Sequence, residues 1–243
     1  ADAAAQGFSF FNGRNHPELD WQVAETEHFE IAYPARLAGI EAHAAAIAEA
    51  SYDSLSVAFG GLTFDRRLRI YLSDEDEIAN GIAFNFGAAG FTTIWVHVND
   101  VATIWTGDVK WLRKVLAHEL AHLFHYRAIR PNLGPLQSLQ YVIANPIPSF
   151  WAEGVAQYLT EEWDAQRGDR WLRTAVFEDR LSYADGTSAW NGRLKYAVGN
   201  SQTRYLAERY GDSTMVNLLA HRKPIALGPH ALPIFRVHDF NEA

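Results

Sequence analysis

Hydrophobic and polar residues alternate in several short stretches of the first part of the chain, a pattern typical of strands with one buried face. The clearest case is Thr93–Asn99. Ile94, Val96 and Val98 fall on one face of it, which predicts a half-buried strand at a sheet edge. Residues 81–90 hold glycines among aromatic side chains and are predicted to form a loop. The other predicted strands are Trp21–Glu25, Phe29–Tyr33 and Leu68–Leu72.

Elsewhere apolar residues recur at helical spacing, and this spacing dominates the second half of the chain. The strongest helix is expected to run from Asp108, a suitable N-cap, to about Arg130, because Pro131 breaks it. Its predicted buried stripe consists of Val109, Leu112, Leu116, Leu120 and Leu123. The other predicted helices cover residues 35–59, 149–163, 169–181 and 194–210, and Gly211 is the stop signal of the last.

These elements predict one domain, 1–243, of the α+β class. Strands and helices mix in an N-terminal lobe, 1–131, which is expected to hold a mixed β-sheet and the strongest helix. The second lobe, 132–243, is expected to be mainly helical. Hydrophobic residues make up 48% of the chain, which is ample for a packed core.

Charge and cysteine content exclude several classes of function. The formal net charge is −8, with 21 basic and 29 acidic residues, which argues against a nucleic-acid partner. The chain has no cysteine, so disulfides, thiol catalysis and thiolate zinc sites are excluded. No apolar run is long enough to predict a membrane span. The small residues Ala1–Ala5 resemble the surroundings of an export cleavage site, so we expect an exported protein, periplasmic or extracellular.

The segment with the clearest chemistry is His118-Glu119-Leu120-Ala121-His122, inside the strongest predicted helix. Residues four apart share one helix face, so both imidazoles can reach one metal ion at about 2.0–2.1 Å. Glu119 lies roughly 100° around the helix, where it can contact an activated water but cannot join the pair as a ligand. The pattern predicts zinc ligands at His118 and His122 and a general base at Glu119. The alternatives are a buried, hydrogen-bonded histidine pair without metal and a solvated helix face.

A catalytic zinc ion needs a third protein ligand. An extended motif with a third histidine on the same run fails, because His125 occupies its glycine position and Ala128 its histidine position. Glu153, on the next helix, fits better, since it stands among apolar residues. Gly154 costs about 1 kcal/mol in a helix relative to alanine, and a close approach of the histidine-bearing helix would explain it. The alternative is that Glu153 only interacts with the N-terminal end of its own helix.

The motif from His118 to His122, followed by Glu153 on the next helix, resembles the gluzincin class of zinc metallopeptidases. The chain is most similar to the bacterial peptidase-MA-like domains that often precede a TolB-type β-propeller. This resemblance extends from Trp21–Phe29 to Tyr205–Gly211, and the zinc motif with Glu153-Gly154 is its most specific part.

The resemblance implies a zincin-like fold, zinc as the cofactor, a peptide or protein substrate, and a β-propeller as a C-terminal partner domain. It also implies a downstream tyrosine that stabilises the oxyanion, for which Tyr196 is the candidate and Tyr205 the rival; either could instead be a core aromatic residue. Some gluzincins carry an aspartate that orients a ligand histidine where this chain has Gln157, so the hydrogen bonds around the ligands must differ.

The function favoured by these residues is hydrolysis of peptide bonds. Zinc would activate a water molecule, and Glu119 would take its proton and pass it to the leaving amine. We expect the substrate to add as an extended strand beside residues 92–98. One alternative is an inactive zinc-binding module that binds peptides or partner proteins. The other is a metal-free structural domain.

Overall fold

A computed structural model describes residues 16–75, 79–86, 89–97, 110–129, 149–161, 168–179 and 192–212, with a few further positions up to residue 233. Its elements mix helices with a five-stranded sheet, so the predicted α+β class is confirmed. The chain forms two compact units, which are described separately. The sheet unit comprises Ala1–Ser54, Phe64–Asn85 and Ala89–Leu123, and the helical unit comprises Leu55–Thr63, Phe86–Ala88 and Phe124–Ala243.

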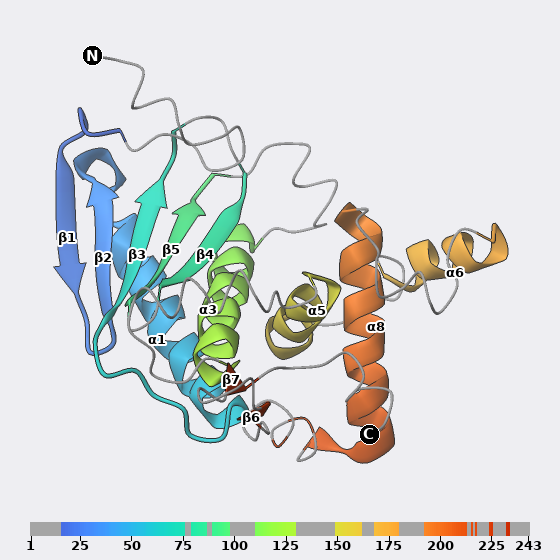
Figure 1. The fold of residues 1–243 in the computed structure, drawn as a ribbon. Coiled ribbons are helices and arrows are strands. Elements are labelled where there is room, and N and C mark those ends of the chain that lie inside the picture. Colours follow the sequence, from blue (N-terminus) through green and yellow to red (C-terminus); the bar gives the residue numbers. More distant parts are fainter. Residues whose placement is uncertain are drawn as a thin grey trace. The chain divides into compact units, whose positions relative to one another are not determined.

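The sheet is mixed, and its strands follow the order β1-β2-β3-β5-β4 (Figure 1). β1 pairs with β2 in antiparallel fashion, whereas β2 with β3 and β3 with β5 are parallel pairs. Three strands occur where the sequence predicts them. The bounds are β1, Trp21–Glu25; β2, Phe29–Pro34; β3, Leu68–Ser73; β4, Gly81–Phe86; and β5, Ala89–Trp95.

The prediction of a loop over residues 81–90 is wrong, because β4 and the start of β5 occupy that stretch. The strand predicted at Thr93–Asn99 is confirmed over Thr93–Trp95, where β5 ends, and Val98 and Asn99 lie outside the described residues. The predicted edge position is wrong, because β5 lies between β3 and β4. A central strand can be buried on both faces, and Ile94 and Trp95 are both buried. Gly81 and Gly90, two of the glycines that suggest a loop, instead lie against side chains of the helix α3 (Trp111–Ile129).

Two helices cover the same face of the sheet, and the strand register shows which face it is. Phe29 pairs with Leu68, so both side chains point to the same face. The ring of Phe29 contacts Tyr52, which places α1 (Ile40–Ala58) over this face. Gly90 faces both Leu68 and Leu123, which places α3 (Trp111–Ile129) over the same face. The apolar side chains between the sheet and these helices form the core of the sheet unit.

α3 is buried on every side over three turns, from Val115 to His125. The predicted stripe is confirmed at Leu116, Leu120 and Leu123, but burial is not restricted to it. Asp108 and Val109, predicted as the N-cap and the first stripe residue, lie outside the described residues.

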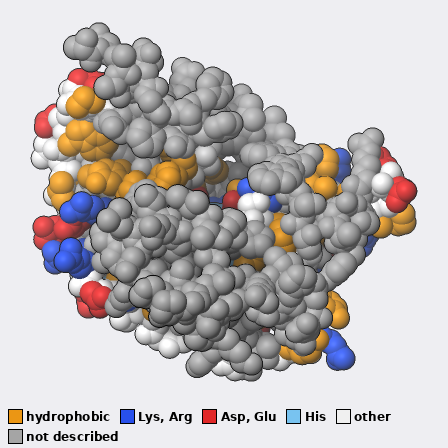
Figure 2. Space-filling model, viewed as in Figure 1, with side chains coloured by type: hydrophobic (Ala, Val, Ile, Leu, Met, Phe, Trp, Pro, Cys, Tyr) orange, Lys and Arg blue, Asp and Glu red, His pale blue; other side chains and the backbone are white. Residues whose placement is uncertain are grey.

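The outer side of the sheet unit is charged. Arg67 pairs with Glu25 at 2.6 Å and Arg69 with Glu30 at 3.0 Å. Figure 2 shows acidic and basic side chains side by side along this part of the surface. Such exposed ion pairs contribute little to the free energy of unfolding, about 0–1 kcal/mol each. Their main effect is to keep this side of the sheet hydrated.

His28, in the turn between β1 and β2, contacts Glu49 and Tyr52 of α1. His28 contacts Glu49 through its Nδ1 at 2.6 Å and stacks on Tyr52 with ring centroids 3.8 Å apart. Partial burial acts to raise the pKa of the Glu49 carboxyl, but hydrogen bonds from Thr26 and His28 outweigh it and hold that pKa below its usual range. Every member of the cluster is used in this local connection, so we assign it a structural role.

Among the described residues of the helical unit, three helices lie close to their predicted positions: α5, Ser149–Thr160; α6, Asp169–Phe177; and α8, Gly192–Tyr210. Gly211 ends α8 with a positive φ of 87°, a conformation that favours glycine, as predicted. A short antiparallel pair, β6 (Pro224–Ile225) with β7 (Leu232–Pro233), follows. Among the described residues no helix is both long and apolar enough to cross a membrane.

α5 and α8 cross at two glycines. A Cβ atom at Gly154 would collide with the carbonyl group of Gly199 and lie 2.6 Å from its Cα. A Cβ atom at Gly199 would in turn lie 2.8 Å from the carbonyl carbon of Phe150. The close approach expected at Gly154 therefore exists, but the helix that makes it is α8, not the histidine-bearing helix that the sequence suggested.

Gly154→Ala is expected to lower the free energy of unfolding by about 3 kcal/mol or more, because the added Cβ meets backbone that cannot rotate away. The better helix propensity of alanine, about 1 kcal/mol, offsets only part of this. Thermal unfolding would show a Tm lower by roughly 2–4 °C per kcal/mol. Gly90→Ala is the matched control, since its Cβ would meet only leucine side-chain ends at 3.3–3.7 Å. An unchanged Tm in Gly154→Ala would contradict the crossing.

Candidate metal centre

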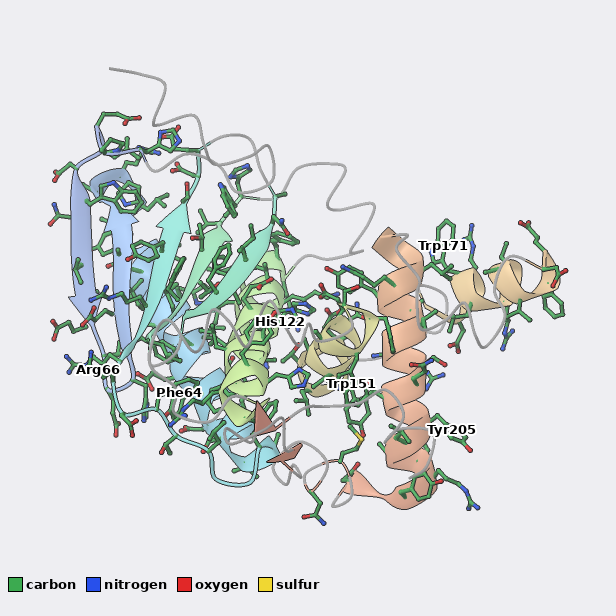
Figure 3. The ribbon with its side chains drawn as sticks, viewed as in Figure 1. Phe64, Arg66, His122, Trp151, Trp171 and Tyr205 are labelled. Atoms are coloured by element: carbon green, nitrogen blue, oxygen red, sulfur yellow. The ribbon has the colours of Figure 1, made fainter. Side chains whose placement is uncertain are left out.

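Three residues of the predicted zinc motif come together on α3 within the sheet unit. His118, Glu119 and His122 are only 8%, 7% and 6% exposed. Their potential ligand atoms all lie within 4.8 Å of one another. The two imidazole rings meet edge to face, with centroids 4.8 Å apart. Figure 3 shows His122 on the middle part of α3.

Glu119 and the two histidines lie on different faces of α3. Glu119 belongs to a stripe with Val115 and Leu123, four residues away on either side, and this stripe packs against glycines of the sheet. His118 and His122 form the neighbouring stripe. The two imidazoles therefore share one face of α3, and the Glu119 carboxylate reaches their ring nitrogens from the side of the helix that contacts the sheet.

The contact between Glu119 and the sheet is close. Gly81, the first residue of β4, leaves the space that the Glu119 side chain fills: a Cβ atom there would lie 2.6 Å from Cγ and 2.8 Å from Oε1. The role of Gly81 was not predicted, because a glycine among aromatic residues is typical of a loop. The signal that could have identified it is a lone glycine at the start of an otherwise apolar strand, which marks a close approach.

The residues could hold a metal ion. Two donors on one tetrahedral zinc ion are roughly 3.4 Å apart, and the three candidate atoms lie within 4.8 Å before any metal is considered. Imidazole nitrogens suit zinc, and a buried carboxylate is favoured beside a cation. His118 and His122 are thus placed to hold a metal ion, with Glu119 beside them.

The other predicted site residues, Glu153 and Tyr196, lie in the helical unit. Glu153 is on α5, and its carboxylate accepts a hydrogen bond from Nζ of Lys195 on α8 at 3.2 Å. The same ammonium group lies 4.9 Å from the ring centroid of Tyr196. The predicted role of Glu153 as third ligand stays a prediction. Lys195 was not predicted, and no local pattern pairs it with a residue so distant in sequence.

The two candidate tyrosines differ in exposure. Tyr205 is 60% exposed, and Figure 3 shows it projecting outward from α8. Tyr196 is half-buried beside Lys195. Burial strengthens hydrogen bonds to a developing charge, so the lower exposure of Tyr196 makes it the better candidate donor of the two.

His125, one turn beyond His122 on α3, lies in a core and not on the surface. It is fully buried in the helical unit, with its ring 6.2 Å from Phe59 and 6.3 Å from Trp151. The position that holds glycine in the extended zinc motif is here part of an aromatic core.

No model of a known protein family matches this chain, and no curated protein matches its sequence.

Proposed function

We propose that the protein is a zinc-dependent metallopeptidase of the gluzincin type. The observation that carries the proposal is the buried cluster of His118, Glu119 and His122, whose potential ligand atoms lie within 4.8 Å of one another. In this proposal His118 and His122 hold the zinc ion and Glu153 is the third ligand. Bound zinc would supply Lewis acidity that activates a water molecule and polarises the scissile carbonyl.

Glu119 is proposed as the general base. Its carboxylate oxygen would accept a proton from the attacking water and then deliver it to the leaving amine. The side chain is only 7% exposed and lies beside His118 and His122, where it can reach a water molecule held at the same site. The Tyr196 hydroxyl would donate a hydrogen bond to the oxygen on which negative charge develops.

The proposed substrate is an extended peptide. Addition beside residues 92–98 does not fit, because β5 is already paired on both sides. β4 is an edge strand, and its first residue, Gly81, contacts Glu119. We therefore propose that the substrate backbone pairs with β4, where a peptide bond would come close to the general base.

The test is to measure zinc in the purified protein and hydrolysis of a peptide library by the same sample. We expect about one zinc ion per chain, cleavage that stops when a chelator removes it, and recovery when zinc is restored. Zinc without cleavage would favour a zinc-binding module that binds peptides or partner proteins. No zinc after supplementation would exclude both and leave a metal-free structural domain.

A further inference from the structure

Gly81 and Glu119 are in contact through the space that a side chain at position 81 would need. A Cβ atom at 81 would lie 2.6 Å from Cγ of Glu119 and 2.6 Å from Cγ2 of Val115. Carbon atoms pack at about 3.5–4.0 Å, so any larger residue at 81 must displace β4 or one of these side chains.

β4 cannot retreat from α3 without breaking its hydrogen bonds to β5. On one side of Gly81, the carbonyl of Asn80 accepts a hydrogen bond from the backbone N–H of Trp95 at 3.1 Å. On the other side, the carbonyl of Ile82 accepts one from the hydroxyl of Thr92 at 2.9 Å. The backbone of β4 is thus held in place immediately before and after Gly81.

α3 cannot retreat either, because it is held to β5 at two points. The indole Nε1 of Trp111, the first residue of α3, donates a hydrogen bond to the carbonyl of Trp95 at 2.8 Å. Further along α3, Leu123 packs over Gly90 at the start of β5. The distance between the helix and the sheet is therefore fixed at both ends of β5.

With the backbone fixed, an added side chain at 81 would displace Glu119. Val115 is β-branched and has one strongly preferred rotamer in a helix, whereas Glu119 has three rotatable bonds. The contact also involves Oε1, which would lie 2.8 Å from the added Cβ, so the carboxylate itself must move.

The geometry points to Gly81 as a positioning residue for the general base: its missing side chain sets where the Glu119 carboxylate lies beside His118 and His122. This inference rests on the proposed function. A displacement of about 1 Å in a catalytic group can cost roughly 10²-fold in rate. Because Gly81 acts through the base and not through the metal ligands, its replacement should lower kcat and leave zinc content unchanged.

The experiment compares Gly81→Ala with Gly90→Ala, which adds the same methyl group to the same face of the sheet against Leu68 and Leu123. Gly81→Ala is expected to lower kcat at least tenfold, with KM changed less than twofold and zinc retained. Gly90→Ala is expected to keep kcat within twofold of the unmodified protein. Equal kcat values for the two variants would overturn the inference.

The double variant Gly81→Ala/Val115→Ala separates positioning from folding. Removing the Val115 methyl groups relieves one of the two collisions, so the double variant should fold even where Gly81→Ala alone does not. Its kcat should stay low, because the collision with Glu119 remains. Recovery of kcat together with Tm would show that Gly81 has only a packing role and would overturn the inference.

A last measurement needs neither metal nor activity. In zinc-free protein, Gly81→Ala should lower Tm by about 4 °C or more, and by clearly less when Glu119→Ala has removed the colliding atoms. Equal Tm changes in both backgrounds would show that the two residues do not interact. If the unmodified protein cleaves no peptide, the metallopeptidase proposal and the catalytic part of this inference fail, whereas the Tm measurement still decides whether the contact exists.

Discussion

Glu119→Gln is expected to lower kcat by about 10²–10⁴-fold while zinc content stays at about one ion per chain. Glutamine has nearly the shape of glutamate, so it should fit the same space between α3 and Gly81. Its amide cannot accept the proton of the attacking water, and only the chemical step should suffer. Steady-state kinetics on the best library peptide, with metal analysis of the same sample, would measure both quantities.

The contrast with Glu119→Asp makes this test sharper. Aspartate keeps a carboxylate but shortens the side chain, so its kcat should fall between those of the unmodified protein and Glu119→Gln. An undiminished kcat in Glu119→Gln would exclude Glu119 as the base. Peptide binding that is indifferent to both substitutions, without turnover in any variant, would support the zinc-binding module instead.

The order and type of most elements could be predicted because their signals are local. Phe29–Tyr33 and Leu68–Leu72 are short apolar runs between turn residues, and both are strands. Gly211 ends α8 because a helix C-terminus favours a positive φ. The prediction for residues 81–90 failed for the opposite reason: Gly81 leaves the space that Glu119 of α3 fills, and Gly90 packs against Leu123 of the same helix, far along the chain. A sequence shows that glycine is present but not which distant element approaches it.

The same distinction applies to the site. The grouping of His118, Glu119 and His122 could be predicted because helical geometry alone brings them together. The contacts that hold the site residues could not. Gly81 reaches Glu119 across the helix–sheet packing, and Lys195 pairs with Glu153 only because α5 and α8 cross closely. These partners depend on tertiary packing, which no local period encodes.

The pattern of apolar residues predicts only part of the burial of α3. The apolar residues at helical spacing correctly identified Leu116, Leu120 and Leu123 as buried. The polar residues between them are buried as well, since burial is continuous from Val115 to His125. A buried helix that carries two histidines and a glutamate at its centre must satisfy them internally, which is itself an argument for a functional cluster.

His122→Ala is expected to abolish zinc binding at stoichiometric concentrations, since it removes one of the two imidazoles that share a face of α3. Losing a direct ligand should cost more than the roughly 10–100-fold in affinity that loss of an outer hydrogen-bonding partner costs. Metal analysis after dialysis against zinc-buffered solution would measure the change. His28→Ala is the matched control in the same unit, since His28 contacts Glu49 and Tyr52 and should leave zinc content unchanged.

Glu153→Ala, measured in the same way, tests whether the third ligand comes from α5. A ligand role predicts a loss of zinc affinity comparable to that of His122→Ala. If Glu153 only pairs with Lys195, zinc affinity should be unchanged, and Lys195→Ala should change Tm as much as Glu153→Ala does. Zinc retained by His122→Ala but lost with Glu153→Ala would place the metal in the helical unit and contradict the proposed centre. Loss of zinc in both His122→Ala and Glu153→Ala, with zinc retained in His28→Ala and Glu119→Gln, would support a site of two histidines and one glutamate. In that case only replacement of a proposed ligand would lower the zinc content.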